Sequence, residues 1–115
     1  MQVQEQAETI KKAKEYKKAH LNLIRFALNK GYNITVYVEG ETELKKSKNF
    51  KAIKDSVECA DETIISIRDN NNKHHGNALI IPFNYDTDIV SDYHCTPFFY
   101  EWESQYEKLT DLLEI

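Results

Sequence analysis

The stretch Thr63–Phe83, TIISIRDNNNKHHGNALIIPF, decides the fold class. It opens with a run of β-branched side chains and closes with the apolar run 78–81, which Pro82 should end. Between the two runs lie the polar, turn-forming residues 69–76. This arrangement predicts an antiparallel hairpin with strands at residues 63–68 and 77–83. Because the run 78–81 does not alternate with polar residues, it predicts a central strand.

A second β pattern lies upstream of this hairpin. Residues 32–39 alternate with period two, which is typical of a half-buried strand. Gly40 predicts a turn, and residues 42–46 are expected to pair back as a short strand. Ser47 then precedes a helical pattern whose apolar positions are Phe50, Ile53 and Val57.

Helices are predicted at both ends of the chain. Residues 5–30 contain no Pro or Gly and are followed by Gly31, which is typical of a helix end. The polar first part, residues 1–15, is expected to protrude or fray. Thr96 and Pro97 are expected to open a final helix. Its apolar face is the strongest in the chain and carries Phe99, Trp102, Tyr106, Leu109 and Leu113.

The composition fits one small α+β domain. The chain has 115 residues, of which 41% are apolar, enough for a single hydrophobic core. We therefore expect residues 1–115 to form one domain with the order helix, strand, short strand, helix, strand, strand, helix. The helices should pack on an antiparallel or mixed sheet.

The sequence offers no membrane or scaffold signal. It lacks an apolar run of about 18–20 residues and the basic and apolar regions of a signal peptide, so we expect a cytoplasmic protein without membrane contact. Cys59 and Cys95 form no CxxC pair, which excludes a disulfide framework and a four-cysteine zinc site. His74, His75 and His94 follow no known metal-ligand spacing, and no cofactor motif is present.

Charge is divided unevenly along the chain. Residues 1–80 hold 14 basic and 11 acidic side chains, a net +3, whereas residues 81–115 hold one basic and 8 acidic side chains, a net −7. The overall charge of −4 disfavours direct nucleic-acid binding, which needs clustered Lys and Arg. An acidic surface can instead dock on a basic protein, although a solvated face chosen for solubility has the same composition.

Two strand ends carry acids. Glu39-Gly40 and, thirty residues later, Asp69 resemble the TOPRIM domain of topoisomerases, primases and nucleases, whose strand-end carboxylates hold Mg²⁺. Asn70 and Asn71 stand where that family has a second acid. The resemblance implies, as an alternative function, a metal-dependent phosphotransferase or nuclease using Glu39, Asp69 and Asp86 or Asp88. A Glu-Gly at a strand end is more often simply a hairpin turn.

The segment 84–92 is a third acidic region. Its Asp86-x-Asp88 pair resembles the motif of haloacid-dehalogenase-type phosphotransferases, in which these residues would be nucleophile and general acid. It does not fit a calcium-binding loop, because Ser91 and Pro97 stand where Gly and Glu are needed. The simplest interpretation is an acidic surface loop.

The final helix carries a second, acidic face. Glu103, Glu107 and Asp111 recur every four residues, with Tyr100 beside them. Like charges at this spacing disfavour the isolated helix by about 0.2–0.5 kcal/mol per pair, which suggests that a partner uses them. We therefore predict partner-binding residues at Tyr100, Glu103, Glu107 and Asp111, with Asp86, Asp88 and Asp92 in the acidic segment.

Residues 22–103 resemble a group of small accessory proteins of bacteriophages and prophages. The resemblance rests on five short stretches: 26–32, 36–41, 46–47, 67–69 and 90–93. It implies a non-catalytic protein that binds or inhibits a host protein, and a host protein that binds nucleic acid is one candidate. A homodimer is a further alternative, expected if Phe98, Trp102 and Tyr106 cannot all be buried in one subunit.

Overall fold

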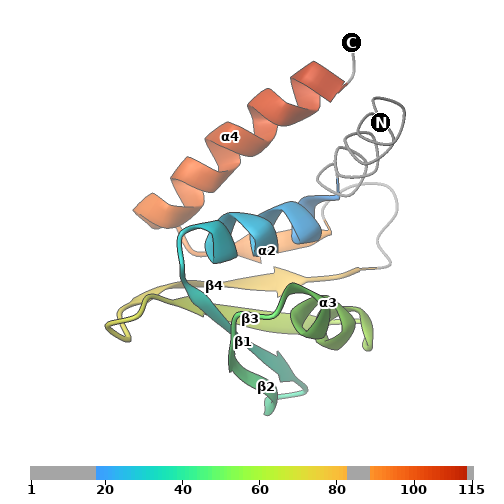
Figure 1. Cartoon of the computed structure of the whole chain (residues 1–115). Coiled ribbons are helices and arrows are strands. Elements are labelled where there is room, and N and C mark those ends of the chain that lie inside the picture. The colour runs from blue at the N-terminus through green and yellow to red at the C-terminus, as the bar shows by residue number, and fades with distance from the viewer. Residues whose placement is uncertain (1–17, 83–88, 114–115) are drawn as a thin grey trace, which may run out of the picture.

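The computed structural model describes residues 18–82 and 89–113 (Figure 1). These residues form an α+β fold with the order α-β-β-α-β-β-β-α, as the sequence predicts apart from one added strand. The elements are α2 (Ala19–Asn29), β1 (Asn33–Val38), β2 (Glu41–Ser47), α3 (Phe50–Glu58), β3 (Thr63–Arg68), β4 (His74–Ile80), β5 (Val90–Tyr93) and α4 (Pro97–Leu113). The predicted protrusion of residues 1–15 lies outside the described residues.

The five strands form one antiparallel sheet in the order β2-β1-β3-β4-β5. The predicted hairpin is confirmed as β3 and β4, in which Ile65 lies opposite Ala78. β4 has a strand on each side, as its apolar run predicts. Its burial nevertheless alternates: Ala78 and Ile80 are buried, whereas Leu79 between them is half-buried. One face of β4 is therefore packed and the other faces away from the core.

The described helices all pack on that one face of the sheet. Inward-facing residues of β1, β3 and β4 share a single core with residues of all three helices. Figure 1 shows α2 and α4 on the same side of the strands. The predicted helix face is confirmed in α3, where Ile53 and Val57 are fully buried and Phe50 packs at the edge of the core. Asn49 caps this helix by accepting the backbone N–H of Ala52 at 2.9 Å.

Two features of the β3–β5 region differ from the expectation. β4 begins at His74, so His74 and His75 belong to the strand rather than to the turn. The segment predicted as a loop contains β5, and Val90 pairs opposite Ile80. Both pairings contain a register shift, and such a bulge hides the period-two pattern that identifies a strand in sequence.

Gly76 allows α4 to approach the sheet closely. Its φ is +124°, a left-handed value that favours glycine. A Cβ placed there would lie 2.8 Å from a ring carbon of Phe99, closer than van der Waals contact permits. The Phe99 ring therefore rests directly on the backbone of β4.

Candidate functional site

The predicted acidic face of α4 is presented to solvent. Tyr100 is 57% exposed, Glu107 and Asp111 are also exposed, and Glu103 is half-buried. We call these four residues the acidic face. The Cys95 thiol beside Tyr100 raises the pKa of the Tyr100 hydroxyl.

A hollow of about 350 Å³ lies between the acidic face and β5. We call it the α4–β5 hollow. It combines aromatic rings from both elements with carboxylates from α4. Among the described residues, its lining consists of Ala19, Ile89, Val90, Tyr93, Trp102, Glu103, Tyr106 and Glu107.

The rings of the α4–β5 hollow are arranged at defined angles. Trp102 is only 4% exposed, so little of its surface is left to a ligand. The Tyr93 ring stands nearly perpendicular to the indole at a centroid distance of 5.7 Å, and the Tyr106 ring is stacked on the indole at 5.5 Å. Two half-buried tyrosines thus flank one buried tryptophan.

Tyr93 lies beside the acidic face, because Tyr93 and Glu103 line the same hollow. Burial raises the pKa of Tyr93 to about 12, and the neighbouring Glu103 carboxylate adds to this shift. The phenol is therefore protonated at neutral pH. The hollow thus places a carboxylate beside the aromatic rings.

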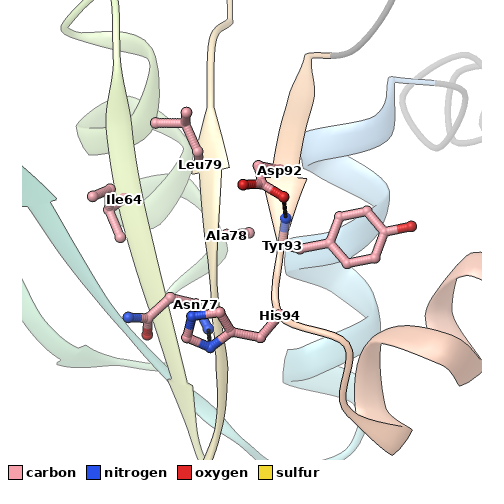
Figure 2. A pocket seen from close by; sticks show the side chains of 7 residues that line it. All are labelled: Ile64, Asn77, Ala78, Leu79, Asp92, Tyr93 and His94. Atoms are coloured by element: carbon pink, nitrogen blue, oxygen red, sulfur yellow. Dashed lines mark hydrogen bonds between the residues drawn. The ribbon is translucent and has the colours of Figure 1, made fainter.

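Asp92 faces a different surface. It lines a smaller hollow of about 190 Å³ together with Ile64, Leu79 and His94, on the face of the sheet opposite the described helices (Figure 2). Figure 2 shows the Tyr93 ring pointing away from this hollow, toward α4. The structure therefore separates Asp92 from the acidic face, although sequence analysis groups them. Asp86 and Asp88, the other predicted contact residues of this segment, lie outside the described residues.

The histidines near this smaller hollow are engaged in protein contacts. His94 Nδ1 accepts the backbone N–H of Asn77 at 3.1 Å, and His74 Nε2 lies 2.7 Å from Oδ1 of the same residue. The His74 and His94 rings meet edge to face at 6.1 Å. Within residues 18–82 and 89–113, no three His, Cys, Asp or Glu side chains are grouped so that they can hold a metal ion.

The predicted metal site of Glu39 and Asp69 does not form. β1 and β3 are antiparallel, with Asn33 opposite Arg68 and Tyr37 opposite Ile64, so the two acids lie beyond opposite ends of the pair. A strand of this length separates them by roughly 15–20 Å, too far for one ion.

Each of these two acids has a local structural role. Glu39 and Gly40 have positive φ values of 53° and 81° and make the two-residue hairpin turn between β1 and β2. Asp69 accepts the backbone N–H groups of Asn71 and Lys73 at 2.8 and 3.0 Å. These hydrogen bonds, that of Lys73 first, lower the pKa of Asp69 and are joined by one to His75. Asp69 therefore organises the β3–β4 turn.

Of the aromatic residues considered for a homodimer interface, two are buried within one chain. Phe98 and Trp102 are each 4% exposed, whereas Tyr106 is half-buried against the core. The homodimer stays a prediction. Cys59 and Cys95 are free thiols, both exposed.

The sequence pattern reveals the acidic face but not the α4–β5 hollow. It assigns Trp102 and Tyr106 to core packing and gives Tyr93 no place in a site. The hollow depends on β5, and the short sequence of β5 carries no strand signal of its own. One signal in the sequence does point to this hollow. Glu103 follows the core residue Phe99 by one helical turn, which places a carboxylate beside the aromatic core.

Comparisons with protein-family models, with curated proteins and with solved structures found no match for this chain. Among the helices described, none has both the length and the apolar character needed to cross a bilayer. Function is therefore inferred from the geometry of the acidic face and the α4–β5 hollow.

Proposed function

We propose that this chain is a non-catalytic binding protein that docks on a basic partner protein through the acidic face. The observation that carries the proposal is the exposure of Tyr100, Glu107 and Asp111 on one helix, beside a hollow lined with aromatic rings. Exposed aromatic side chains surrounded by charge are typical of binding hot spots. Tyr100 supplies contact area, and the carboxylates supply electrostatic attraction.

The charge distribution supports a basic partner. The segment 81–115 has a net charge of −7, and its one basic residue is Lys108. Clustered negative charge raises the association rate with a basic surface and makes binding sensitive to salt. The resemblance to phage accessory proteins extends the proposal to a host protein as the partner. Host proteins that bind nucleic acid fit best, because they present basic surfaces.

Charge reversal of the acidic face tests this function. The test variant carries Glu103→Lys, Glu107→Lys and Asp111→Lys. The matched control carries Asp55→Lys, Asp61→Lys and Glu62→Lys, three exposed acids on and after α3. Both variants change the net charge by the same amount, so a difference between them reports on position. Circular dichroism and thermal melting establish that each variant is folded.

The wild type and both variants are used as bait in a host lysate, and captured proteins are then purified and titrated. We expect a host protein that binds the wild type and the control alike, is released as salt rises from roughly 50 to 500 mM, and binds the test variant at least about tenfold more weakly. Equal binding to the test variant and the control would overturn the acidic face as the docking surface. Absence of any salt-sensitive host partner would overturn the binding function.

A further inference from the structure

The strand β2 forms one edge of the sheet. Among the strands that the structure describes, only β1 pairs with it (Figure 1). Both β4 and β5, which residues 83–88 connect, lie on the far side of β1 and β3 from this edge. An edge strand has a row of backbone N–H and C=O groups that face away from its neighbour, so it can pair with a further strand.

The charged side chains of β2 are divided by sign along the strand. Glu41 and Glu43 lie in its first half, Lys45 and Lys46 lie in its second half, and all four are exposed. None of them forms an ion pair with another described residue. Charges of one sign would protect an edge, because they repel a second copy of it. The two signs of β2 instead complement a copy that runs in the opposite direction.

We propose that β2 pairs antiparallel with β2 of a second copy of this chain and joins two five-stranded sheets into one continuous sheet. A two-fold axis relates the copies, so each contributes the same surface. With Leu44 opposite its own copy, each Glu43 lies opposite a Lys45 of the other chain. Opposite charges on directly opposed residues favour a strand pair, and like charges disfavour it.

Leu44 selects this register. It lies opposite the fully buried Val36, is half-buried and packs against the core, so its side chain is on the face that the helices cover. Two copies of Leu44 at the centre add an apolar cross-strand contact on that face. A register centred on Glu43 would instead place two like charges opposite each other.

The shape of β2 limits the length of the pairing. Its pairing with β1 contains two register shifts, and Lys46 has a positive φ of 47°, so the strand bends. The backbone N–H of Lys46 is donated to Thr35 Oγ1 at 3.0 Å. The new pairing is therefore centred on residues 43–45, and the dimer should dissociate on dilution.

This dimer differs from the one considered for Phe98, Trp102 and Tyr106, because those side chains belong to α4. No residue of the acidic face takes part in it either. The inference therefore goes beyond the proposed function, and the failure of one leaves the other standing.

Exchange of charge within β2 tests the inference. One variant carries Glu41→Lys and Glu43→Lys, which makes the strand basic, and the other carries Lys45→Glu and Lys46→Glu, which makes it acidic. Sedimentation equilibrium over roughly 10–500 µM measures the dimer Kd. We expect a dimer for the wild type and a Kd at least about tenfold higher for each variant alone. An equimolar mixture of the two variants should recover the dimer, because opposite charges then face each other.

A matched control carries Asp61→Lys and Glu62→Lys, two exposed acids outside β2, and should dimerise like the wild type. Circular dichroism establishes that each variant is folded. A monomeric wild type at the highest concentration, a charge variant that dimerises like the wild type, or a mixture that stays monomeric would each overturn the inference.

Amide hydrogen exchange gives a second measurement that needs no variant. In the wild type, backbone N–H groups of β2 should exchange more slowly at high than at low protein concentration, because pairing removes them from water. Exchange in β5, at the other edge of the sheet, should not depend on concentration. Exchange in β2 that is the same at both concentrations would also overturn the inference.

Discussion

Trp102 Nε1 donates a hydrogen bond of 2.9 Å to Oδ1 of Asn22, a residue 80 positions earlier in the chain. Gln105 Nε2 donates to the same oxygen at 2.6 Å. Asn22 is 5% exposed, so one buried amide oxygen serves two donors of α4. This contact joins α2 to α4 and fixes the orientation of the indole that lines the α4–β5 hollow.

Replacing Asn22 with alanine should therefore destabilise the fold. The buried indole N–H would lose its acceptor, and an unsatisfied buried donor costs about 1–3 kcal/mol. Urea denaturation of Asn22→Ala measures the loss in the free energy of unfolding. Asn29→Ala, at an exposed position of the same helix, should change that free energy by less than about 0.5 kcal/mol. A similar effect of the two substitutions would contradict the role given to Asn22.

Gly76→Ala should be among the most damaging single substitutions in the sheet. The added methyl group meets the Phe99 ring at 2.8 Å, and the φ of +124° is unfavourable for alanine. Overpacking alone costs about 1–3 kcal/mol, and the backbone strain adds about 1 kcal/mol. Gly40→Ala separates the two effects, because Gly40 also has a positive φ but no atom lies within 4 Å of the place that its added methyl group would take. Chemical denaturation should show the smaller loss for Gly40→Ala, and the reverse order would refute the packing argument.

Acid should destabilise the protein in two steps. Burial lowers the pKa of His20 below its usual 6.5, although its hydrogen bond to Glu58 opposes the shift. Burial would raise the pKa of Glu58, but hydrogen bonds from Lys54 and His20 outweigh it, so that pKa is lowered from 4.5. In both cases the unfolded chain binds protons more readily than the folded one, so stability falls as pH decreases.

The melting temperature measured between about pH 8 and pH 3 tests this sign. It should begin to fall near pH 6.5, where the unfolded histidine takes up a proton, and fall again below pH 4.5 as Glu58 is protonated. His20→Gln should remove the first decrease and leave much of the second. A melting temperature that rises on acidification across this range would show the opposite linkage.

Asp69 should stabilise the β3–β4 turn mainly as a hydrogen-bond acceptor, and its negative charge should contribute less. Its carboxylate oxygen Oδ1 accepts two backbone N–H groups of the β3–β4 turn, and an asparagine side chain offers the same kind of acceptor. We expect Asp69→Ala to lower the melting temperature clearly and Asp69→Asn to lower it less. Equal losses in the two variants would show that the charge, through His75 or otherwise, is what the turn needs.

The parts of the fold that were predicted correctly carry their signal within one element. The strand 63–68 and the apolar face of α3 follow from a local period, and Thr96-Pro97 marks the start of α4. The acidic face was predicted from the same kind of local signal, since Glu103 and Glu107 are neighbours on one helix.

The parts that were missed depend on pairing between elements. β5 is four residues long and becomes a strand by pairing with β4 through a register shift. His75 lies at the other register shift of β4, so its place in the strand cannot be read from alternation. The α4–β5 hollow needs Tyr93 and Tyr106 to approach from two elements. No spacing pattern in the sequence indicates that the side chains of Tyr93 and Tyr106 lie close together.

Gly76 helps to set how α4 lies against the sheet. The Phe99 ring occupies the space that a side chain at position 76 would fill, and Glu103 follows Phe99 by one helical turn. The position of the Glu103 carboxylate relative to Tyr93 therefore depends on Gly76 of β4 having no Cβ atom. A side chain at position 76 would consequently shift α4, and with it the acidic face, relative to β5, although Gly76 itself has no side chain that takes part in that face.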